Sequence, residues 1–200
     1  MTAQAKAVFL KSAFRAADFP ALPHPEIAVM GRSNVGKSSF LNMVTGVRGL
    51  VKVGAKPGVT KSINFFILEG RITLVDLPGY GYAKLPVEMK KQFLPLIRSY
   101  LAARDRLRLV FLLIDIRREP GDFEHEMIAH LEKLGIPTAI VATKCDKLPR
   151  GRRAQRRREI ADGLGIGADS VFLSSAETGD GKKELMGLIR EYGSGKEKDV

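Results

Sequence analysis

Eight consecutive residues of the 200-residue chain have the types and spacing of a phosphate-binding loop. Residues 31–38 read Gly-Arg-Ser-Asn-Val-Gly-Lys-Ser and satisfy the pattern G-x-x-x-x-G-K-[ST]. The two glycines let the backbone curve so that its N–H groups face phosphate oxygens, and a helix beginning near Lys37 directs its positive end to the same place. We expect Lys37 to reach the outer phosphates and the Ser38 hydroxyl to bind Mg²⁺. Every residue of the loop is a predicted nucleotide contact: Gly31, Arg32, Ser33, Asn34, Val35, Gly36, Lys37 and Ser38.

The residues around this loop have the patterns that the motif requires. Residues 25–30 are an apolar run that predicts a strand, and residues 39–44 continue as a helix with an apolar face. Strand, glycine loop and helix in this order favour a phosphate site over an ordinary glycine-rich turn.

A second motif, Asp76-Leu77-Pro78-Gly79, follows the predicted strand at residues 71–75. Its carboxylate would emerge at the same end of the sheet as the phosphate loop. Asp76 is expected to hold Mg²⁺ through a water, and Gly79 to turn its N–H toward a γ-phosphate. The predicted contacts here are Asp76, Leu77, Pro78 and Gly79.

Two further motifs could recognise a base. Asp146, in Thr143-Lys144-Cys145-Asp146, could accept two hydrogen bonds from the N1 and N2 donors of guanine, which adenine lacks. The Lys144 stem could lie along the base plane. Backbone N–H groups of Ser174-Ser175-Ala176 could meet the guanine O6. The order of all these motifs along the chain predicts a site for a guanine nucleotide.

The apolar pattern predicts one doubly wound α/β domain. Residues 63–69 and 71–76 read as an antiparallel hairpin, and residues 107–115, 138–142 and 171–173 as buried strands. Helical patterns lie near residues 88–103, 122–134 and 181–191. We expect a mostly parallel sheet with one antiparallel strand and helices on both faces, with ligands at the carboxyl ends of the strands. Residues 1–25 are predicted to be an irregular arm packed on the domain, residues 26–191 the nucleotide-binding domain, and residues 192–200 a frayed tail.

Composition indicates a basic protein of the cytoplasm. Lys and Arg outnumber Asp and Glu by 33 to 22, which gives a net charge of +11 and favours polyanionic partners. The single cysteine, Cys145, excludes an internal disulfide and fits a reducing compartment. Neither an export signal nor an apolar run long enough to span a bilayer is visible. A monomer is the default expectation.

Taken together, the motifs place the chain near one family. The loop at residues 31–39, Lys56-Pro57-Gly58-Val59-Thr60, residues 76–83 and residues 143–148 together resemble the EngB (YihA/YsxC) family of Era-like, translation-associated GTPases. This resemblance covers about residues 26–190. It implies a GTP- and Mg²⁺-dependent switch that assists assembly of the large ribosomal subunit and is linked to cell division and septation.

The same resemblance assigns a role to the stretch after the phosphate-loop helix. It implies that Thr60 is the switch threonine, which approaches Mg²⁺ and the γ-phosphate only in the GTP state. Nucleotide contacts are expected along the stretch Gly58, Val59, Thr60, Lys61 and Ser62. The candidate catalytic groups are Asn34, Lys37, Thr60 and Gly79, and the candidate metal ligands are Ser38, Thr60 and, through water, Asp76.

Two residue types bear on catalysis. The residue after Gly79 is Tyr80, where many signalling GTPases carry a water-orienting glutamine, so intrinsic hydrolysis is expected to be slow. Asn34 occupies a position at which related GTPases hold a K⁺ ion, and it could alternatively satisfy a loop carbonyl.

A run rich in arginine follows the proposed base site. Its six arginines repel one another, which favours contact with rRNA over a merely solvated helix face. They are Arg150, Arg152, Arg153, Arg156, Arg157 and Arg158.

Two other functions stay open on the sequence alone. A P-loop kinase acting on a small acceptor would explain residues 31–38 but leave Thr60 and Asp146 without a role. An RNA-binding protein with a vestigial nucleotide site would explain the arginine run but not the intact Lys37 and Asp76.

Overall fold

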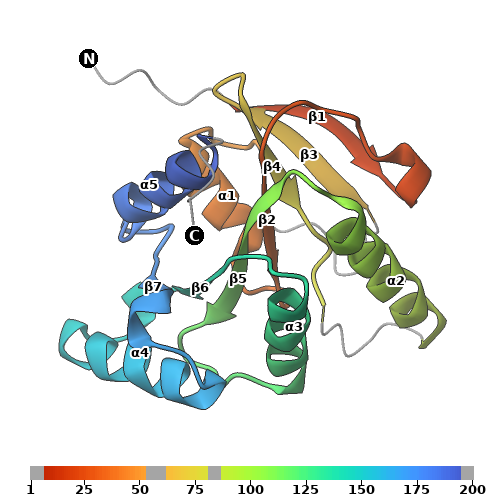
Figure 1. Ribbon diagram of the computed structural model, residues 1–200. Coiled ribbons are helices and arrows are strands. Elements are labelled where there is room, and N and C mark those ends of the chain that lie inside the picture. The colour runs from red at the N-terminus through yellow and green to blue at the C-terminus, as the bar shows by residue number, and fades with distance from the viewer. Residues whose placement is uncertain (1–6, 53–61, 81–86, 195–200) are drawn as a thin grey trace.

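The chain folds around one seven-stranded sheet, seen in a computed structural model that describes residues 7–52, 62–80 and 87–194. The strand order is β1-β3-β4-β2-β5-β6-β7 (Figure 1). β3 pairs antiparallel with both of its neighbours, β1 and β4, whereas all the other neighbouring pairs are parallel. The predicted sheet with one antiparallel strand is confirmed. The strands are Ala7–Ala13 (β1), Glu26–Gly31 (β2), Ile63–Leu68 (β3), Ile72–Asp76 (β4), Leu107–Asp115 (β5), Thr138–Thr143 (β6) and Val171–Leu173 (β7).

Helices cover both faces of this sheet. Buried side chains of α1 and α5 pack with one apolar cluster, and those of α2, α3 and α4 pack with a second cluster on the opposite face. The helices are α1 (Lys37–Thr45), α2 (Val87–Ala103), α3 (Asp122–Lys133), α4 (Arg150–Leu164) and α5 (Lys182–Tyr192), with short 3-10 turns η1 (Ala16–Asp18), η2 (Cys145–Lys147) and η3 (Ala168–Ser170). The predicted layered α/β architecture is therefore confirmed.

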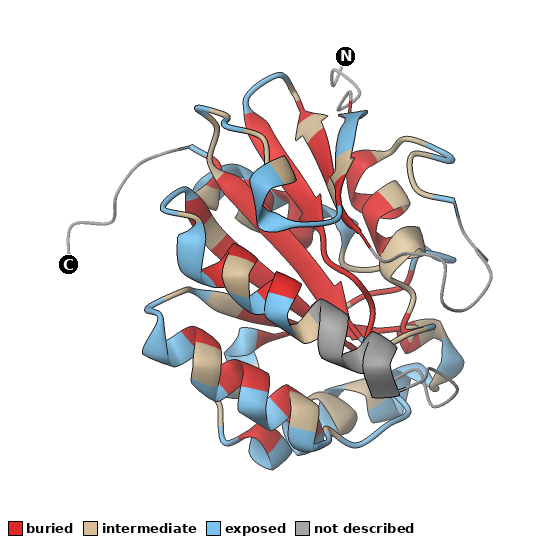
Figure 2. Cartoon of the chain, turned by 90° about the vertical axis from the view of Figure 1, so that its right-hand side faces the viewer, coloured by how far each residue is buried: buried red, intermediate tan, exposed pale blue. Residues whose placement is uncertain are grey.

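The central strands are mostly apolar because each is covered on both faces. Every residue of β2 is buried, as is almost every residue of β5 and β6. Figure 2 shows the buried strands at the centre of the molecule, with exposed residues on the outer sides of the helices. This rigid centre fixes where the loops at the carboxyl ends of β2, β4, β5, β6 and β7 emerge.

One expectation for the N-terminal segment is wrong. Residues 7–13 are not irregular but form β1, which pairs with β3 from Ala7 opposite Leu68 to Ala13 opposite Ile63. The prolines that suggested an irregular arm lie at positions 20, 23 and 25, beyond the end of β1, so they do not interrupt its ladder. Residues 1–6 lie outside the described part of the chain.

Helix α4 is the element that apolar periodicity does not predict. Its buried residues are Ile160, Ala161 and Leu164, all in the last part of the helix, whereas residues 150–158 are mostly charged. The helix ends at Gly165, whose φ of 67° suits glycine. None of the helices in the described ranges combines the length and the apolar character needed to cross a bilayer.

Candidate functional site

The phosphate loop lies between the end of β2 and the start of α1, as the sequence predicts. A Cβ on Gly31 would lie only 2.9 Å from both the Leu113 carbonyl oxygen and the Val35 side chain, so only glycine fits there. Gly36 has a φ of 104°, which disfavours any other residue, and its carbonyl accepts the N–H of Phe40 in the first turn of α1. Helix α1 thus begins at Lys37 with free N–H groups at the loop.

The Asp76–Gly79 segment is tied directly to this loop. The Ser33 N–H donates to the Tyr80 carbonyl (2.7 Å), and the Tyr80 N–H donates to the Gly31 carbonyl (3.3 Å). The Lys37 ammonium donates to the carboxylate of Asp76, which is almost fully buried at the end of β4. The two motifs that the sequence places far apart are therefore one structural unit.

The side-chain oxygens near Lys37 are suitable ligands for a hard cation that binds together with phosphate. Ser38 presents a hydroxyl in the first turn of α1, and Asp76 a carboxylate; oxygen ligands of this kind are those that Mg²⁺ prefers. In the described ranges no three His, Cys, Asp or Glu residues gather as a metal site.

The loop between β6 and α4, residues 144–149, also contacts the phosphate loop. The Thr143 hydroxyl donates to the Val35 carbonyl (2.7 Å), and the Lys144 ammonium donates to the Asn34 carbonyl (2.6 Å). Lys144 has a φ of 58°, a left-handed conformation that is unusual for a residue other than glycine. The Asn34 carbonyl is consequently already bound by Lys144.

The carboxylate of Asp146 is held by the next loop along the sheet edge, residues 174–181. The Ser175 hydroxyl donates to Asp146 Oδ1 (2.6 Å), and the Lys147 ammonium lies 3.0 Å from Oδ2. The hydrogen bond from Ser175, followed by the contact with Lys147, holds the pKa of Asp146 below its usual range. Asp146 is therefore an ionised acceptor, as recognition of base N–H donors requires.

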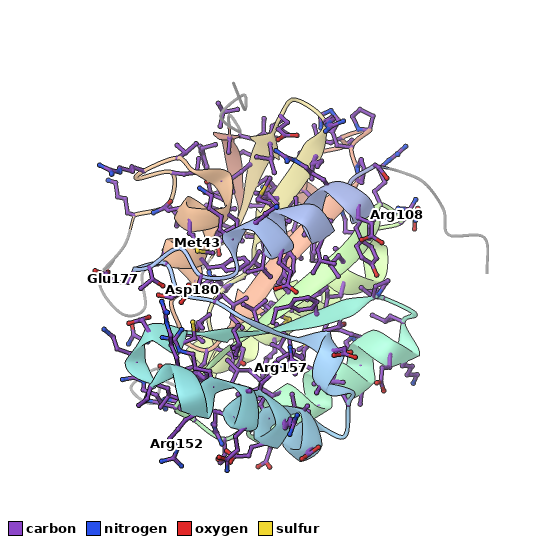
Figure 3. The ribbon with its side chains drawn as sticks, turned by 90° about the vertical axis from the view of Figure 1, so that its left-hand side faces the viewer. Met43, Arg108, Arg152, Arg157, Glu177 and Asp180 are labelled. Carbon is purple, nitrogen blue, oxygen red and sulfur yellow. The ribbon has the colours of Figure 1, made fainter. Side chains whose placement is uncertain are left out.

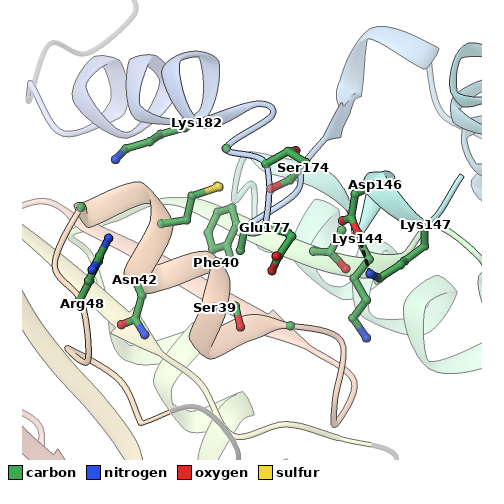
Figure 4. A pocket seen from close by; sticks show the side chains of 17 residues that line it. Ser39, Phe40, Asn42, Arg48, Lys144, Asp146, Lys147, Ser174, Glu177 and Lys182 are labelled. Atoms are coloured by element: carbon green, nitrogen blue, oxygen red, sulfur yellow. Dashed lines mark ion pairs between the residues drawn. The ribbon is translucent and has the colours of Figure 1, made fainter. Parts of the chain in front are cut away.

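These loops enclose a cavity of about 650 Å³ at the carboxyl edge of the sheet. That size is typical of a small-ligand pocket. Figure 4 shows α1 side chains on one wall, Asp146 and Lys144 at one end, and Lys182 and Arg48 at the other. Its lining includes the predicted residues Gly36, Thr143, Lys144, Asp146, Ser174 and Ala176.

Comparison with known proteins identifies the family. A family model described as "50S ribosome-binding GTPase" matches residues 26–144. "Probable GTP-binding protein EngB" of Pelobacter propionicus is 46% identical to this chain, over 92% of this chain and 94% of its own length. The chain belongs to the EngB family of GTPases. The protein of the same name from Geotalea daltonii is 45% identical, over 92% of this chain and 88% of its own length.

Solved structures agree with this membership. A crystal structure of a probable GTP-binding protein engB matches with a TM-score of 0.71 and 25% identity, covering 86% of this chain and 100% of its own. The G domain of the FeoB iron transporter of T. maritima matches with a TM-score of 0.53 and 28% identity, covering 84% of this chain and 98% of its own. The resemblance inferred from the motifs is confirmed.

Part of the predicted EngB site lies outside the described residues. This applies to Gly58, Val59, Thr60 and Lys61. Ser62 is described: its buried hydroxyl donates to Asn64 Oδ1 (3.1 Å), and the Asn64 amide in turn lies 3.4 Å from Asp76 Oδ2. Ser62 thus supports Asp76 through Asn64 rather than facing the cavity itself.

Tyr80 is fixed against α3. Its hydroxyl donates to Glu124 Oε1 (2.6 Å), and its ring stacks on Phe123 with centroids 3.7 Å apart. Burial, followed by the Glu124 carboxylate, raises the pKa of Tyr80 well above its usual range, so the phenol stays neutral. The side chain that replaces the water-orienting glutamine is thereby engaged with α3, close to Arg32 of the phosphate loop.

Asp115 is a site residue that the sequence analysis missed. At the end of β5 it lies 3.0 Å from the Lys144 ammonium and accepts two hydrogen bonds from the Arg117 guanidinium (2.8 and 2.7 Å). Burial opposes ionisation of Asp115, but the hydrogen bonds from Arg117 and Lys144 outweigh it and lower its pKa. The signal in the sequence was an acidic residue ending a buried strand at the carboxyl edge of the sheet.

The cavity also has lining residues that no motif indicated. They come from α1, from the segment after it, and from the 174–181 loop and the start of α5: Phe40, Asn42, Met43, Gly46, Arg48, Glu177, Thr178, Gly179 and Lys182. Ser39 and Lys147 also line the cavity, and they lie in the motif stretches 31–39 and 143–148.

The six arginines of the basic run do not share one free face. Arg153 and Arg156 are largely covered, and Arg156 donates to the Ile116 and Arg118 carbonyls (both 2.7 Å). Arg157 is half-buried, whereas Arg150, Arg152 and Arg158 are exposed. Figure 3 shows Arg152 projecting from α4 away from the domain.

Proposed function

We propose that this protein is a GTP-binding and GTP-hydrolysing switch that assists assembly of the large ribosomal subunit. The observation that carries the proposal is that Lys37 joins Asp76 to the phosphate loop at the same edge of the sheet at which Gly36 of that loop and Asp146 line one cavity. The description of the matching family model, "50S ribosome-binding GTPase", supports the choice of partner. We include in the proposal a cytoplasmic location, a monomeric state and a link to cell division and septation.

In the proposed complex, GTP lies with its base between Asp146 and the 174–181 loop and its phosphates at the start of α1. Lys37 binds the outer phosphates after its ammonium leaves its present partner, the Asp76 carboxylate. Ser38, Thr60 and, through water, Asp76 would hold Mg²⁺, which would neutralise charge on the phosphates. The Gly79 N–H donates to the γ-phosphate.

We propose slow hydrolysis in the absence of the partner, roughly 0.0001 to 0.01 per second, as is usual for unstimulated GTPases. The engagement of Tyr80 with Glu124 supports slow hydrolysis, because the residue after Gly79 is then occupied with a partner on α3. Asn34 is proposed to help hold a K⁺ ion. Equal hydrolysis rates in potassium and sodium buffers of the same ionic strength would contradict that role.

We propose that rRNA is met by the exposed members of the arginine run, Arg150, Arg152 and Arg158. Three phosphate contacts would give a logarithmic salt dependence of roughly −2 to −3. Because Arg153 and Arg156 already bond groups of the protein, we leave them out of this surface.

The test is co-sedimentation of the full chain with large-subunit particles in potassium buffer, with a non-hydrolysable GTP analogue, with GDP or without nucleotide. Binding that needs the GTP analogue supports the proposal. Tight GTP binding without co-sedimentation in any state would contradict the ribosomal role and leave the nucleotide site standing. A triple replacement of the exposed arginines by alanine should weaken co-sedimentation and leave GTP affinity unchanged.

A further inference from the structure

Arg153 belongs to the arginine run, but its guanidinium is used inside the protein. From the second turn of α4 its Nε donates to the Leu148 carbonyl (3.1 Å), and its Nη1 donates to Asp180 Oδ2 (3.0 Å). Only 16% of the side chain is exposed, whereas the adjacent Arg152 belongs to the exposed residues. The two neighbours in sequence therefore have different roles.

The two groups that Arg153 binds belong to different loops of the cavity. Leu148 lies in the 144–149 loop, two residues after Asp146, whereas Asp180 lies in the 174–181 loop, five residues after Ser175. Charge-assisted hydrogen bonds of a guanidinium are directional as well as strong, so one side chain that bonds both loops fixes their separation.

The contacts of these residues close a ring around the base end of the cavity. The Ser175 N–H donates to the Asp180 carbonyl (3.1 Å), and the Ser175 hydroxyl donates to the Asp146 carboxylate (2.6 Å). The Cys145 N–H donates to the Ser174 carbonyl (3.0 Å) and its thiol donates weakly to the Asp180 side chain (3.7 Å), which are further contacts between the loops. Arg153 thus completes a path that runs from Asp146 through Ser175 and Asp180 back to Leu148.

We propose that Arg153 is a positioning residue that sets the separation of the 144–149 loop from the 174–181 loop. It thereby sets the selectivity of the site for guanine. The inference rests on the proposed function, which puts guanine between these loops. Asp146 can bond the guanine N1 and N2 donors together only when its carboxylate lies in the plane of the base. A displacement of about 1 Å is enough to lose such alignment.

The experiment compares the affinities for GDP and IDP, because hypoxanthine differs from guanine only in lacking the 2-amino group. Arg153→Ala should weaken GDP binding about tenfold and IDP binding about twofold in calorimetric titrations, since one of the two charge-assisted bonds to guanine is lost. The ratio of the two affinities should therefore fall about fivefold. Asp180→Ala should lower the ratio similarly, and Arg153→Lys should restore part of it, because an ammonium can reach Asp180.

Arg152→Ala is the matched control, since Arg152 is exposed and next in sequence. It should leave both affinities unchanged. An unchanged ratio in Arg153→Ala overturns the inference, as does an equal loss for both nucleotides, which would indicate a merely structural role. If Arg153→Ala does not fold, the ratio of GDP to IDP affinity in Asp180→Ala and Arg153→Lys tests the inference in its place. Failure of the unmodified protein to prefer GDP over IDP would instead contradict the proposed function.

Discussion

The base end and the phosphate end of the proposed nucleotide site differ in how their polar groups are partnered. At the base end, Lys144 is held by Asp115 and by the Asn34 carbonyl, and Asp146 is held by Ser175. A carboxylate has about four acceptor positions, so Asp146 can accept further donors without losing these partners. At the phosphate end, Lys37 and Asp76 bind each other. The base end is therefore preformed, whereas nucleotide binding must redistribute the contacts at the phosphate end.

The largest effect should come from replacing Lys37, because its ammonium must leave Asp76 to bind the phosphates. Lys37→Ala should lower kcat/KM for GTP by at least about a hundredfold, because it removes the cation that the outer phosphates would meet. It also leaves the buried Asp76 without its ion-pair partner. Steady-state hydrolysis measures the effect, and Lys133→Ala on the exposed side of α3 is the control. Hydrolysis within threefold of the unmodified protein would remove Lys37 from the phosphate site.

At the base end, Asp146→Asn should change which nucleotide is bound rather than abolish binding. The amide can donate where the carboxylate accepted, so preference should move from GTP toward xanthosine triphosphate, with GTP affinity falling by a factor of about a hundred. Competition between the two nucleotides measures the shift. An unchanged preference would place the base elsewhere.

A side chain at Gly31 in the phosphate loop should lower the stability of the folded protein. Gly31→Ala puts a methyl group within 2.9 Å of the Leu113 carbonyl, so we expect a loss of about 1–3 kcal/mol in the free energy of unfolding. Urea denaturation measures the loss. Gly167→Ala is the control, because its φ is −67° and no neighbour lies within 4 Å of the added carbon. Equal stability of the two variants would contradict the close packing described for Gly31.

The smallest effect concerns Asp115, which anchors the preformed end. Its folded-state pKa is lowered, so its stabilisation is present above the unfolded pKa of about 3.9 and is lost as the pH falls through the folded pKa. Asp115→Asn should therefore cost about 1–2 kcal/mol at pH 7, and the difference from the unmodified protein should shrink below about pH 4. Urea denaturation at pH 7, 5, 4 and 3 tests this, with the exposed Asp162→Asn as control. A difference that is independent of pH would show that charge is not involved.

The sequence predicts the sheet and most of the phosphate and base loops because their signals are local. A strand that is covered on both faces is apolar throughout, and a phosphate loop needs its glycines at fixed spacing. Asp115 and Arg153 were not assigned to the site because their partners are distant in sequence: Lys144 is 29 residues from Asp115, and Asp180 is 27 residues from Arg153. Only the fold brings these charges together.

Strand β1 and helix α4 show the same limit for secondary structure. The segment of residues 7–13 is a strand because β3 offers it a pairing edge, and α4 is a helix although its first nine residues are mostly charged. Local patterns indicated neither the pairing edge nor the surface on which Ile160 and Leu164 pack. The arginine run suggested an entirely external surface, but Arg156 bonds carbonyls of the segment after β5.

The stacking of Tyr80 on Phe123 makes the segment after Asp76 open to optical spectroscopy. The chain contains four tyrosines and no tryptophan, so Phe123→Trp would introduce a single indole that lies against the Tyr80 ring. Energy transfer from Tyr80 to that indole depends steeply on their separation. The wavelength and intensity of one fluorophore would then report in real time whether Tyr80 leaves α3 when nucleotide enters the phosphate loop.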